Sequence, residues 1–172
     1  VSWEQANAFC NWRTEFLRKS LGKEGVYVEP YRLPTEAEWE FAARAGVNKN
    51  KYPWEGDLPL TEDEGCFYAN FKPQEGNYVK DGSIVCAPVG TYEPNDFGLF
   101  DMAGNVSEWT STAYTESIDR MTSDLNPEYR YNVAKDDPYK MSRKIVRGGS
   151  WKDVAHNIRA DLRTWEYQNE QR

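Results

Sequence analysis

The sequence predicts a mixed fold of helices and strands with little regular secondary structure. Two helix-start signals precede Gly46, whereas residues 47–141 show neither the 3.6-residue period of a helix nor the alternation of a strand. Near the end of the chain, a short apolar run before Gly148-Gly149 is typical of a strand. We therefore expect two short helices near the N-terminus, a long loop-rich stretch and a few very short strands.

The first helix is expected over residues 3–21. Ser2 and Gln5 form a capping box, in which the hydroxyl and the side-chain amide each satisfy a backbone N–H at the helix start. Apolar residues that recur at helical spacing predict a buried face made of Ala6, Phe9, Cys10, Phe16 and Leu17. On that face we expect the Cys10 thiol to be buried and inert.

A second helix is expected over residues 36–45. Thr35 and Glu38 form a second capping box, and acidic residues lie in the first turn, where the helix dipole favours negative charge. Gly46 gives the stop signal at the other end.

The last elements are predicted to be a strand at 144–147 and its partner at 157–164, joined through the Gly148-Gly149 pair. The loop-rich stretch before them is too long for a compact domain unless something other than strand pairing holds it. Bound metal ions and stacked aromatic side chains are two such devices.

The composition limits the function classes. A chain of 172 residues has the length of one domain. A formal net charge of -7 and a pI near 4.9 exclude the basic field that nucleic-acid binding needs. The apolar runs are far shorter than the roughly 18–20 residues of a membrane-spanning helix. The three cysteines, Cys10, Cys66 and Cys86, allow at most one disulfide, for which Cys66–Cys86 is the candidate.

Four sequence blocks carry the strongest functional signal. They are VSWEQA at 1–6 with FCNW at 9–12, YRLPTEAEWE at 31–40, NDFGLFDMAGNVSEW at 95–109 and RGGSW at 147–151. In this order they resemble the formylglycine-generating enzyme, or sulfatase-modifying factor, family. The resemblance implies an α+β fold related to C-type lectins, with loops held by calcium. It also implies a single domain over 1–172 whose two ends lie outside this sequence.

The resemblance further implies that the family's oxidative chemistry is absent. Active members carry two cysteines at the second and seventh residues after the Gly-Gly-Ser-aromatic turn, where they bind copper and activate oxygen. Here these positions hold Asp153 and Ile158, and no cysteine follows Cys86. Because a thiolate is the nucleophile and the soft Cu(I) ligand, we assign no catalytic residue and expect no copper. The iron-dependent branch of the family needs a histidine cluster, whereas this chain has only His156.

The family's pattern also implies two calcium sites. Calcium is a hard cation that takes six to eight oxygen ligands from carboxylates, side-chain amides and backbone carbonyls. The first set carried over is the Asn70 and Asp81 side chains with the carbonyls of Phe71 and Ser83. The second set is the Asp101 and Glu108 side chains with the carbonyls of Gly104 and Val106.

Within the family, the runs at 147–155 and 163–168 resemble the gliding-motility and type IX secretion lipoproteins of Bacteroidetes-type bacteria. That resemblance implies a non-catalytic scaffold in the periplasm, associated with the outer membrane through an upstream lipid anchor. Its expected partners are other secretion or gliding proteins, arranged in a ring. Residues 115–142 resemble an insertion and are the first candidate for contact with a partner.

Two other functions stay open at this point. One is an enzyme of the same family with altered chemistry at Asp153, His156 and Arg163. The other is a peptide- or sugar-binding module that uses a groove near Trp151, lined by the same three residues and Arg159. Alternatively, these arginines form ordinary ion pairs with some of the 28 acidic residues.

Overall fold

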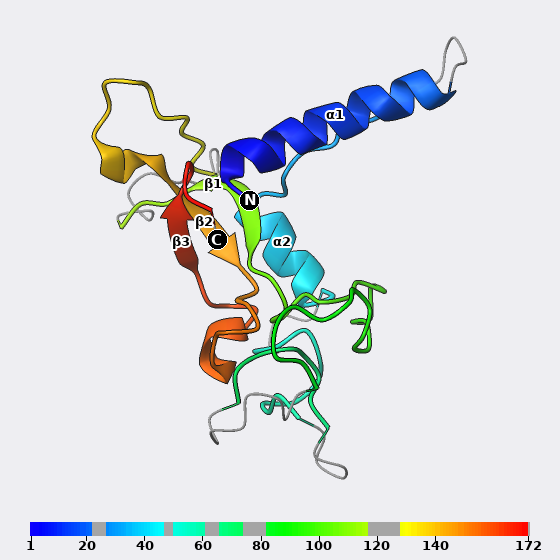
Figure 1. The fold of residues 1–172 in the computed structure, drawn as a ribbon. Helices are drawn as coiled ribbons and strands as arrows, with labels where there is room; N and C mark the ends of the chain where they lie inside the picture. The colour runs from blue at the N-terminus through cyan, green and yellow to red at the C-terminus, as the bar shows by residue number, and fades with distance from the viewer. Residues whose placement is uncertain (22–26, 47–49, 61–65, 74–81, 117–127, 172) are drawn as a thin grey trace. The chain divides into compact units, whose positions relative to one another are not determined.

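The computed structural model describes residues 1–21, 27–46, 50–60, 66–73, 82–116 and 128–171. Its elements in chain order are α1 (Trp3–Leu21), α2 (Glu36–Ala43), β1 (Glu108–Ala113), the 3-10 helix η1 (Tyr139–Ser142), β2 (Arg143–Arg147), the 3-10 helix η2 (Ala155–Ile158) and β3 (Thr164–Tyr167). The three strands form one sheet in the order β1-β2-β3, in which the arrows of β2 and β3 run in opposite directions (Figure 1). The mixed α+β class with little regular structure is thus confirmed.

The strand at the end of the chain is displaced from its predicted position. β2 covers the predicted 144–147, but residues 155–158 form η2 and the partner strand begins only at Thr164. The cause lies next to the Gly-Gly turn. A Cβ added to Gly149 would lie 2.7 Å from the carbonyl oxygen of Asn157 and 2.9 Å from the Ile158 side chain. The backbone of residues 157–158 therefore packs on the turn itself and does not extend along β2.

The chain divides into two compact units. The first consists of residues 1–35, 109–145 and 165–172, and the second of residues 36–108 and 146–164.

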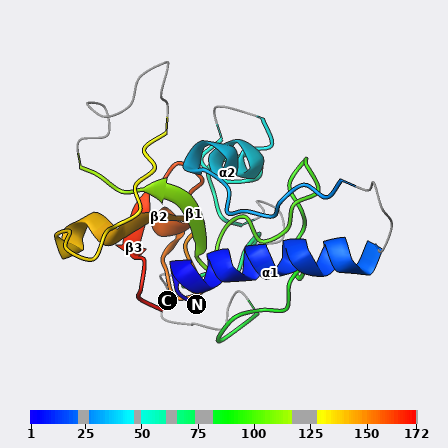
Figure 2. The ribbon, with the colours of Figure 1, turned by 90° about the horizontal axis from the view of Figure 1, so that it is seen from above.

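In the first unit, α1 begins at the predicted capping box. The Ser2 backbone N–H donates to Gln5 Oε1 at 3.0 Å, and the Gln5 N–H donates to Ser2 Oγ at 3.3 Å. The Trp3 indole N–H then reaches the carbonyl of Thr110 in β1 at 2.8 Å. These local and distant bonds together fix the N-terminal end of α1, the long helix in Figures 1 and 2.

The aromatic face predicted for α1 is wrong in part. Phe9, Trp12 and Phe16 are 60%, 54% and 48% exposed, and the Trp12 ring stacks on Phe16 and makes a tilted contact with Phe9. The fully buried residue of this helix is Thr14, whose hydroxyl donates to the Cys10 carbonyl and accepts the Tyr31 N–H. The buried side of α1 is therefore the side that carries Thr14, and the two phenylalanines lie on a neighbouring, exposed side of the helix. Cys10 is half-buried, and burial raises the pKa of its thiol.

A buried lysine lies at the centre of the first unit. Lys144 of β2 is 1% exposed, and its Nζ donates to the Tyr131 carbonyl at 2.6 Å and to Asn132 Oδ1 at 3.3 Å. Its Nζ also lies 4.1 Å from the centre of the Trp3 ring, within range of a cation–π contact. Burial lowers the pKa of Lys144 to about 8, because the charged form loses its hydration.

In the second unit, α2 ends two residues before its predicted last residue. Ala45 and Gly46 have φ of 49° and 79°, and the Gly46 N–H donates to the Phe41 carbonyl at 3.2 Å. Such left-handed residues are a common helix stop, and glycine adopts them without steric cost.

Among the described residues, the core of the second unit has two apolar clusters. The larger one contains Tyr52, Ala69, Phe71, Ala103 and Ile158, and the smaller one contains Trp39, Ala43 and Ala160. In the described part of the chain, no helix combines the length and apolar content that a membrane crossing requires. The structure also forms no disulfide between Cys66 and Cys86.

Candidate functional site

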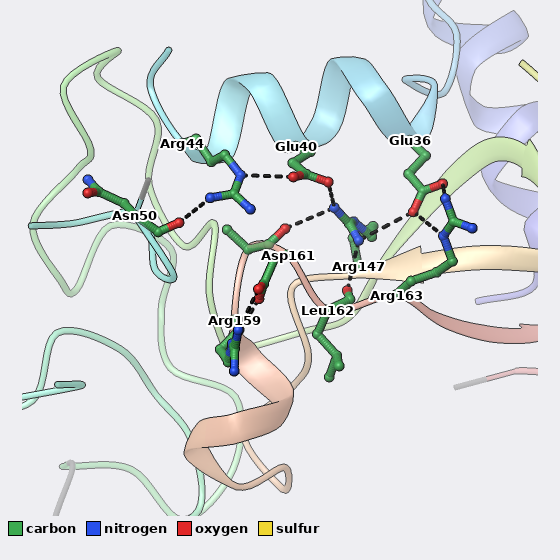
Figure 3. Close-up of polar contacts among 10 residues, drawn as sticks. Glu36, Glu40, Arg44, Asn50, Arg147, Arg159, Asp161, Leu162 and Arg163 are labelled. Carbon is green, nitrogen blue, oxygen red and sulfur yellow. Dashed lines mark hydrogen bonds and ion pairs between the residues drawn. The ribbon is translucent and has the colours of Figure 1, made fainter. Parts of the chain in front are cut away.

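The second unit contains a buried charge network between α2 and residues 147–163 (Figure 3). Arg147 is 1% exposed and forms ion pairs with Glu36, at 3.3 Å, and with Glu40. Its guanidinium also donates to the carbonyls of Ala160 and Leu162, at 2.9 Å each. A buried charge is tolerated only when it is paired and hydrogen-bonded, as this one is.

Two further arginines complete the network. Arg163 holds Glu36 with two parallel bonds of 2.7 and 2.6 Å, and Arg44 binds Glu40 at 2.9 Å. Figure 3 shows Glu36 and Glu40 of α2 pointing toward these cations. The network therefore ties α2 to the chain that follows β2, and its arginines have intramolecular partners.

The two positions of the family's copper-binding cysteines have structural roles. Asp153 Oδ2 accepts the Ser150 N–H at 2.9 Å and the Ser150 hydroxyl at 2.6 Å, which closes the turn after Gly149. Ile158 is 0% exposed and belongs to the larger apolar cluster. A carboxylate bound to its own turn and a buried aliphatic side chain offer neither a soft ligand nor a nucleophile.

The groove proposed near Trp151 does not gather its four side chains on one ligand position. Asp153 binds Ser150, Arg163 binds Glu36, and Arg159 binds Asp161 with bonds of 2.8 and 2.5 Å. His156 is exposed on η2. The hydrogen bond from Arg159 lowers the pKa of the Asp161 carboxyl. These contacts favour the reading of the arginines as ion-pair partners.

The first predicted calcium set is described in part. Asn70 is 1% exposed, and its Nδ2 donates to the Val85 carbonyl at 2.8 Å. Its Oδ1 is buried and accepts no hydrogen bond within the described ranges. Phe71 and Ser83 are described, whereas Asp81 lies outside the described residues. A buried amide oxygen without a donor fits a hard cation, because such an atom is costly unless something binds it.

The second predicted calcium set contains a half-buried acid, Glu108. Glu108 Oε2 accepts the Trp39 indole N–H at 2.5 Å. Burial, with a smaller contribution from the negative charge of Asp101, raises the pKa of Glu108. A cation between the two acids would offset both effects. The residues of this set therefore fit a calcium ion in chemistry, and the assignment stays a prediction.

The backbone around this second set is unusual. Asp101 and Asn105 have φ of 55° and 59°, a conformation that costs energy in residues other than glycine. At Gly104 a Cβ would lie 2.1 Å from the Asn70 carbonyl oxygen, so only glycine fits there. The Asn105 N–H donates to that same carbonyl at 2.8 Å. Gly104 of the second set and its neighbour Asn105 therefore pack directly against the backbone of Asn70 in the first set.

Sequence reasoning missed the role of Asn105 as a structural hub. Its Oδ1 accepts the Ala87 N–H at 2.9 Å, its Nδ2 donates to the Ala87 carbonyl at 3.2 Å, and its own carbonyl accepts the Trp151 N–H at 3.0 Å. The available signal is the Gly-Asn pair, since asparagine is the residue that best tolerates left-handed backbone after glycine.

Comparison with known proteins finds relatives named as formylglycine-generating enzymes and as inactive formylglycine-generating enzymes. Inactive C-alpha-formylglycine-generating enzyme 2 of Bos taurus is 34% identical over 156 residues, which covers 90% of this chain and 38% of that protein. The formylglycine-generating enzyme of Streptomyces coelicolor is 32% identical over 151 residues, which covers 88% of this chain and 40% of that protein. The chain thus spans about two fifths of the length of these relatives.

A solved structure and a family model extend the match. PvdO from Pseudomonas aeruginosa superposes with a TM-score of 0.67 and 25% identity, over 99% of this chain and 56% of that one. The model of the sulfatase-modifying factor enzyme 1-like domain matches residues 1–172. The fold, the sequence blocks and this match along the whole length lead to one conclusion: the chain belongs to the sulfatase-modifying factor, or formylglycine-generating enzyme-like, family.

Proposed function

We propose that this chain is a non-catalytic, calcium-stabilised scaffold domain of a bacterial envelope complex for type IX protein secretion or gliding motility. The observation that carries the non-catalytic part is the state of the two cysteine positions. Asp153 is bound to the Ser150 turn, and Ile158 is buried in the core. A relative with 34% identity is itself named an inactive formylglycine-generating enzyme, which supports the same reading.

Calcium supplies the stabilising part of the proposal. When bound, calcium would neutralise the acids of the second set and coordinate Asn70 Oδ1 of the first set, which accepts no hydrogen bond within the described residues. The residues that would hold it are Asn70, Asp81, Asp101 and Glu108 through side chains, and Phe71, Ser83, Gly104 and Val106 through carbonyls. This chain then contributes a scaffold whose loops depend on an ion more than on strand pairing.

The envelope role rests on the resemblance of the runs at 147–155 and 163–168 to the secretion and gliding lipoproteins. In this role the domain lies in the periplasm at the outer membrane, attached through a lipid anchor upstream. It contacts other secretion or gliding proteins within a ring. Since Arg163 is engaged by Glu36, the partner contact is sought first at residues 115–142, of which 117–127 lie outside the described residues.

Two experiments test the proposal separately. For catalysis, the chain is incubated with Cu(I) and a cysteine-containing sulfatase peptide, and aldehyde formation is measured by mass spectrometry. We expect neither stoichiometric copper binding nor aldehyde, and either result would contradict the non-catalytic assignment. An active formylglycine-generating enzyme serves as the positive control.

For the scaffold role, the full-length native protein is cross-linked in its own cell envelope, purified and analysed by quantitative mass spectrometry. We expect a stoichiometric secretion or gliding protein linked within 115–142. Recovery of the uncomplexed protein alone would refute the scaffold role and leave the non-catalytic assignment untouched.

A further inference from the structure

The second unit contains a cavity of about 130 Å³, and among its described lining residues Asp101 alone also belongs to a proposed calcium set. The residues that shape its chemistry are Trp54, Tyr68, Glu93, Asn95, Asp101 and Met102. None of them belongs to the Ser150 turn or to η2, where the family's cysteines would lie. An engineered cavity of about 150 Å³ holds one benzene molecule, so this cavity accepts a ligand of four to five carbon atoms or a single side chain.

One wall of the cavity is a stack of aromatic rings. Trp54 lies 5.0 Å from Tyr52 and 5.1 Å from Tyr68 between ring centres, and both pairs are stacked. Tyr52 is buried, and its hydroxyl donates to the Ala155 carbonyl at 3.2 Å. The Trp54 indole N–H donates to the Leu58 carbonyl at 2.8 Å. The wall is therefore held in place before any ligand arrives.

Another part of the cavity lining is a loop organised by Asn95. Its Nδ2 donates to the carbonyls of Ala42 and Ala43 at the end of α2, at 2.8 and 3.2 Å. Its Oδ1 accepts the N–H groups of Phe97 and Leu99 at 3.1 and 3.0 Å. Both the nitrogen and the oxygen of the Asn95 amide are thus bonded to backbone groups, which fixes the loop. The loop therefore does not need to become ordered when a ligand binds. A preformed site loses less entropy when a ligand enters it.

The charge of the cavity has one sign. Among the described residues that line it, the ionisable carboxyl side chains are Glu93 and Asp101, and none is a lysine, arginine or histidine. Glu93 is exposed, and Asp101 uses Oδ2 to accept the Gly90 N–H at 2.9 Å. Aromatic and apolar walls next to two carboxylates suit a ligand with an apolar body and a positive end.

We propose that this cavity binds a primary ammonium group carried on a short aliphatic chain. The aliphatic part packs against Trp54, Tyr68 and Met102, and the ammonium donates its N–H groups to Glu93 and Asp101. Two sources share this chemistry, a free small amine and a lysine side chain of a peptide. The formal net charge of -7 attracts either one to the surface.

Isothermal titration calorimetry of the 172-residue chain tests the proposal with n-butylammonium, n-butanol and butyrate as probes. We expect saturable binding of n-butylammonium and none of the other two. Equal binding of n-butanol would overturn the proposal, because it would show an apolar cavity without selection for charge. An absence of n-butylammonium binding would overturn it as well.

Variants then locate the site. Glu93→Gln keeps the shape of an exposed side chain and is expected to weaken n-butylammonium binding about fivefold, the upper range for an exposed ion pair. Asp96→Asn removes an exposed acid of the same loop that does not line the cavity, and is expected to change nothing. Equal affinity of the wild type and Glu93→Gln would refute the site. Circular dichroism checks that both variants are folded.

Two further titrations distinguish a peptide lysine from a free amine, and an amine site from a calcium site. Nα-acetyl-lysine amide is compared with its Nε-acetylated form, and binding of the first alone assigns the cavity to a peptide lysine. Binding of n-butylammonium but of neither lysine derivative assigns it to free amines. The titration is repeated in saturating Ca²⁺, because Asp101 is also a predicted calcium ligand. Loss of n-butylammonium binding there would overturn the proposal by showing that the amine stands in for the metal.

Discussion

Raising the pH above 8 is expected to stabilise this protein through Lys144. In the unfolded chain the lysine keeps its ordinary pKa of 10.5, whereas burial lowers it to about 8 in the folded state. Between these two values the unfolded state binds more protons than the folded state, so the free energy of unfolding rises with pH. The pKa difference corresponds to about 3 kcal/mol over the whole interval, at about 1.4 kcal/mol per pH unit.

Urea unfolding of the wild type and of Lys144→Met at several pH values between about 7 and 10 measures this effect. Subtracting the two curves removes the titration of the tyrosines and of the other lysines. As the pH rises through 8, the free energy of unfolding of the wild type is expected to increase relative to that of Lys144→Met. Lys140→Met serves as a control, since Lys140 is an exposed lysine on the neighbouring η1. A difference between wild type and Lys144→Met that stays constant from pH 7 to 10 would refute the reasoning.

Other perturbations follow from contacts described above. Chelation of Ca²⁺ is expected to lower the melting temperature, because the buried Asn70 oxygen loses its ligand; an unchanged transition in calorimetry would contradict both calcium sites. Arg147→Ala removes the buried cation that Glu36 and Glu40 share and leaves the Ala160 and Leu162 carbonyls without their donor, and is expected to cost about 3 kcal/mol in denaturant unfolding; a cost below about 1 kcal/mol would contradict the network. Gly104→Ala is expected to prevent native folding, whereas Gly82→Ala, which has open space around it, costs only about 1–2 kcal/mol of backbone strain. Phe9→Ser is expected to change stability by less than about 0.5 kcal/mol, because Phe9 is exposed; a larger loss in thermal unfolding would show that its ring is packed.

The parts of the fold that depend on neighbouring residues could be predicted from the sequence. The Ser2–Gln5 capping box and the Gly46 stop need only a few adjacent residues, and both form as expected. The partner strand of β2 was misplaced because its start depends on the fit of residues 157–158 against Gly149, which no local pattern encodes.

Helix periodicity alone could not choose the buried row of α1. Phe9 and Phe16 repeat at helical spacing, but Thr14 is the residue that satisfies the Tyr31 N–H and turns inward. The burial of Lys144 was equally hidden, since lysine is typical of exposed positions. In contrast, the expectation that copper chemistry is absent rests on residue identity alone, because no arrangement of Asp153 and Ile158 replaces two thiolates.

The charge network of α2 also determines when this helix is completed during synthesis. Glu40 and Arg147 are separated by 107 residues, and Glu36 and Arg163 by 127. While the chain is being translated, α2 is made more than 100 residues before Arg147 and Arg163, the two cations that bind it from a distance. A ribosome-bound or truncated product that ends before Arg147 therefore exposes two acids and the apolar face of Trp39. Non-local contacts of this kind slow folding and leave intermediates open to association, so native packing of the second unit must follow synthesis of the chain through Arg163.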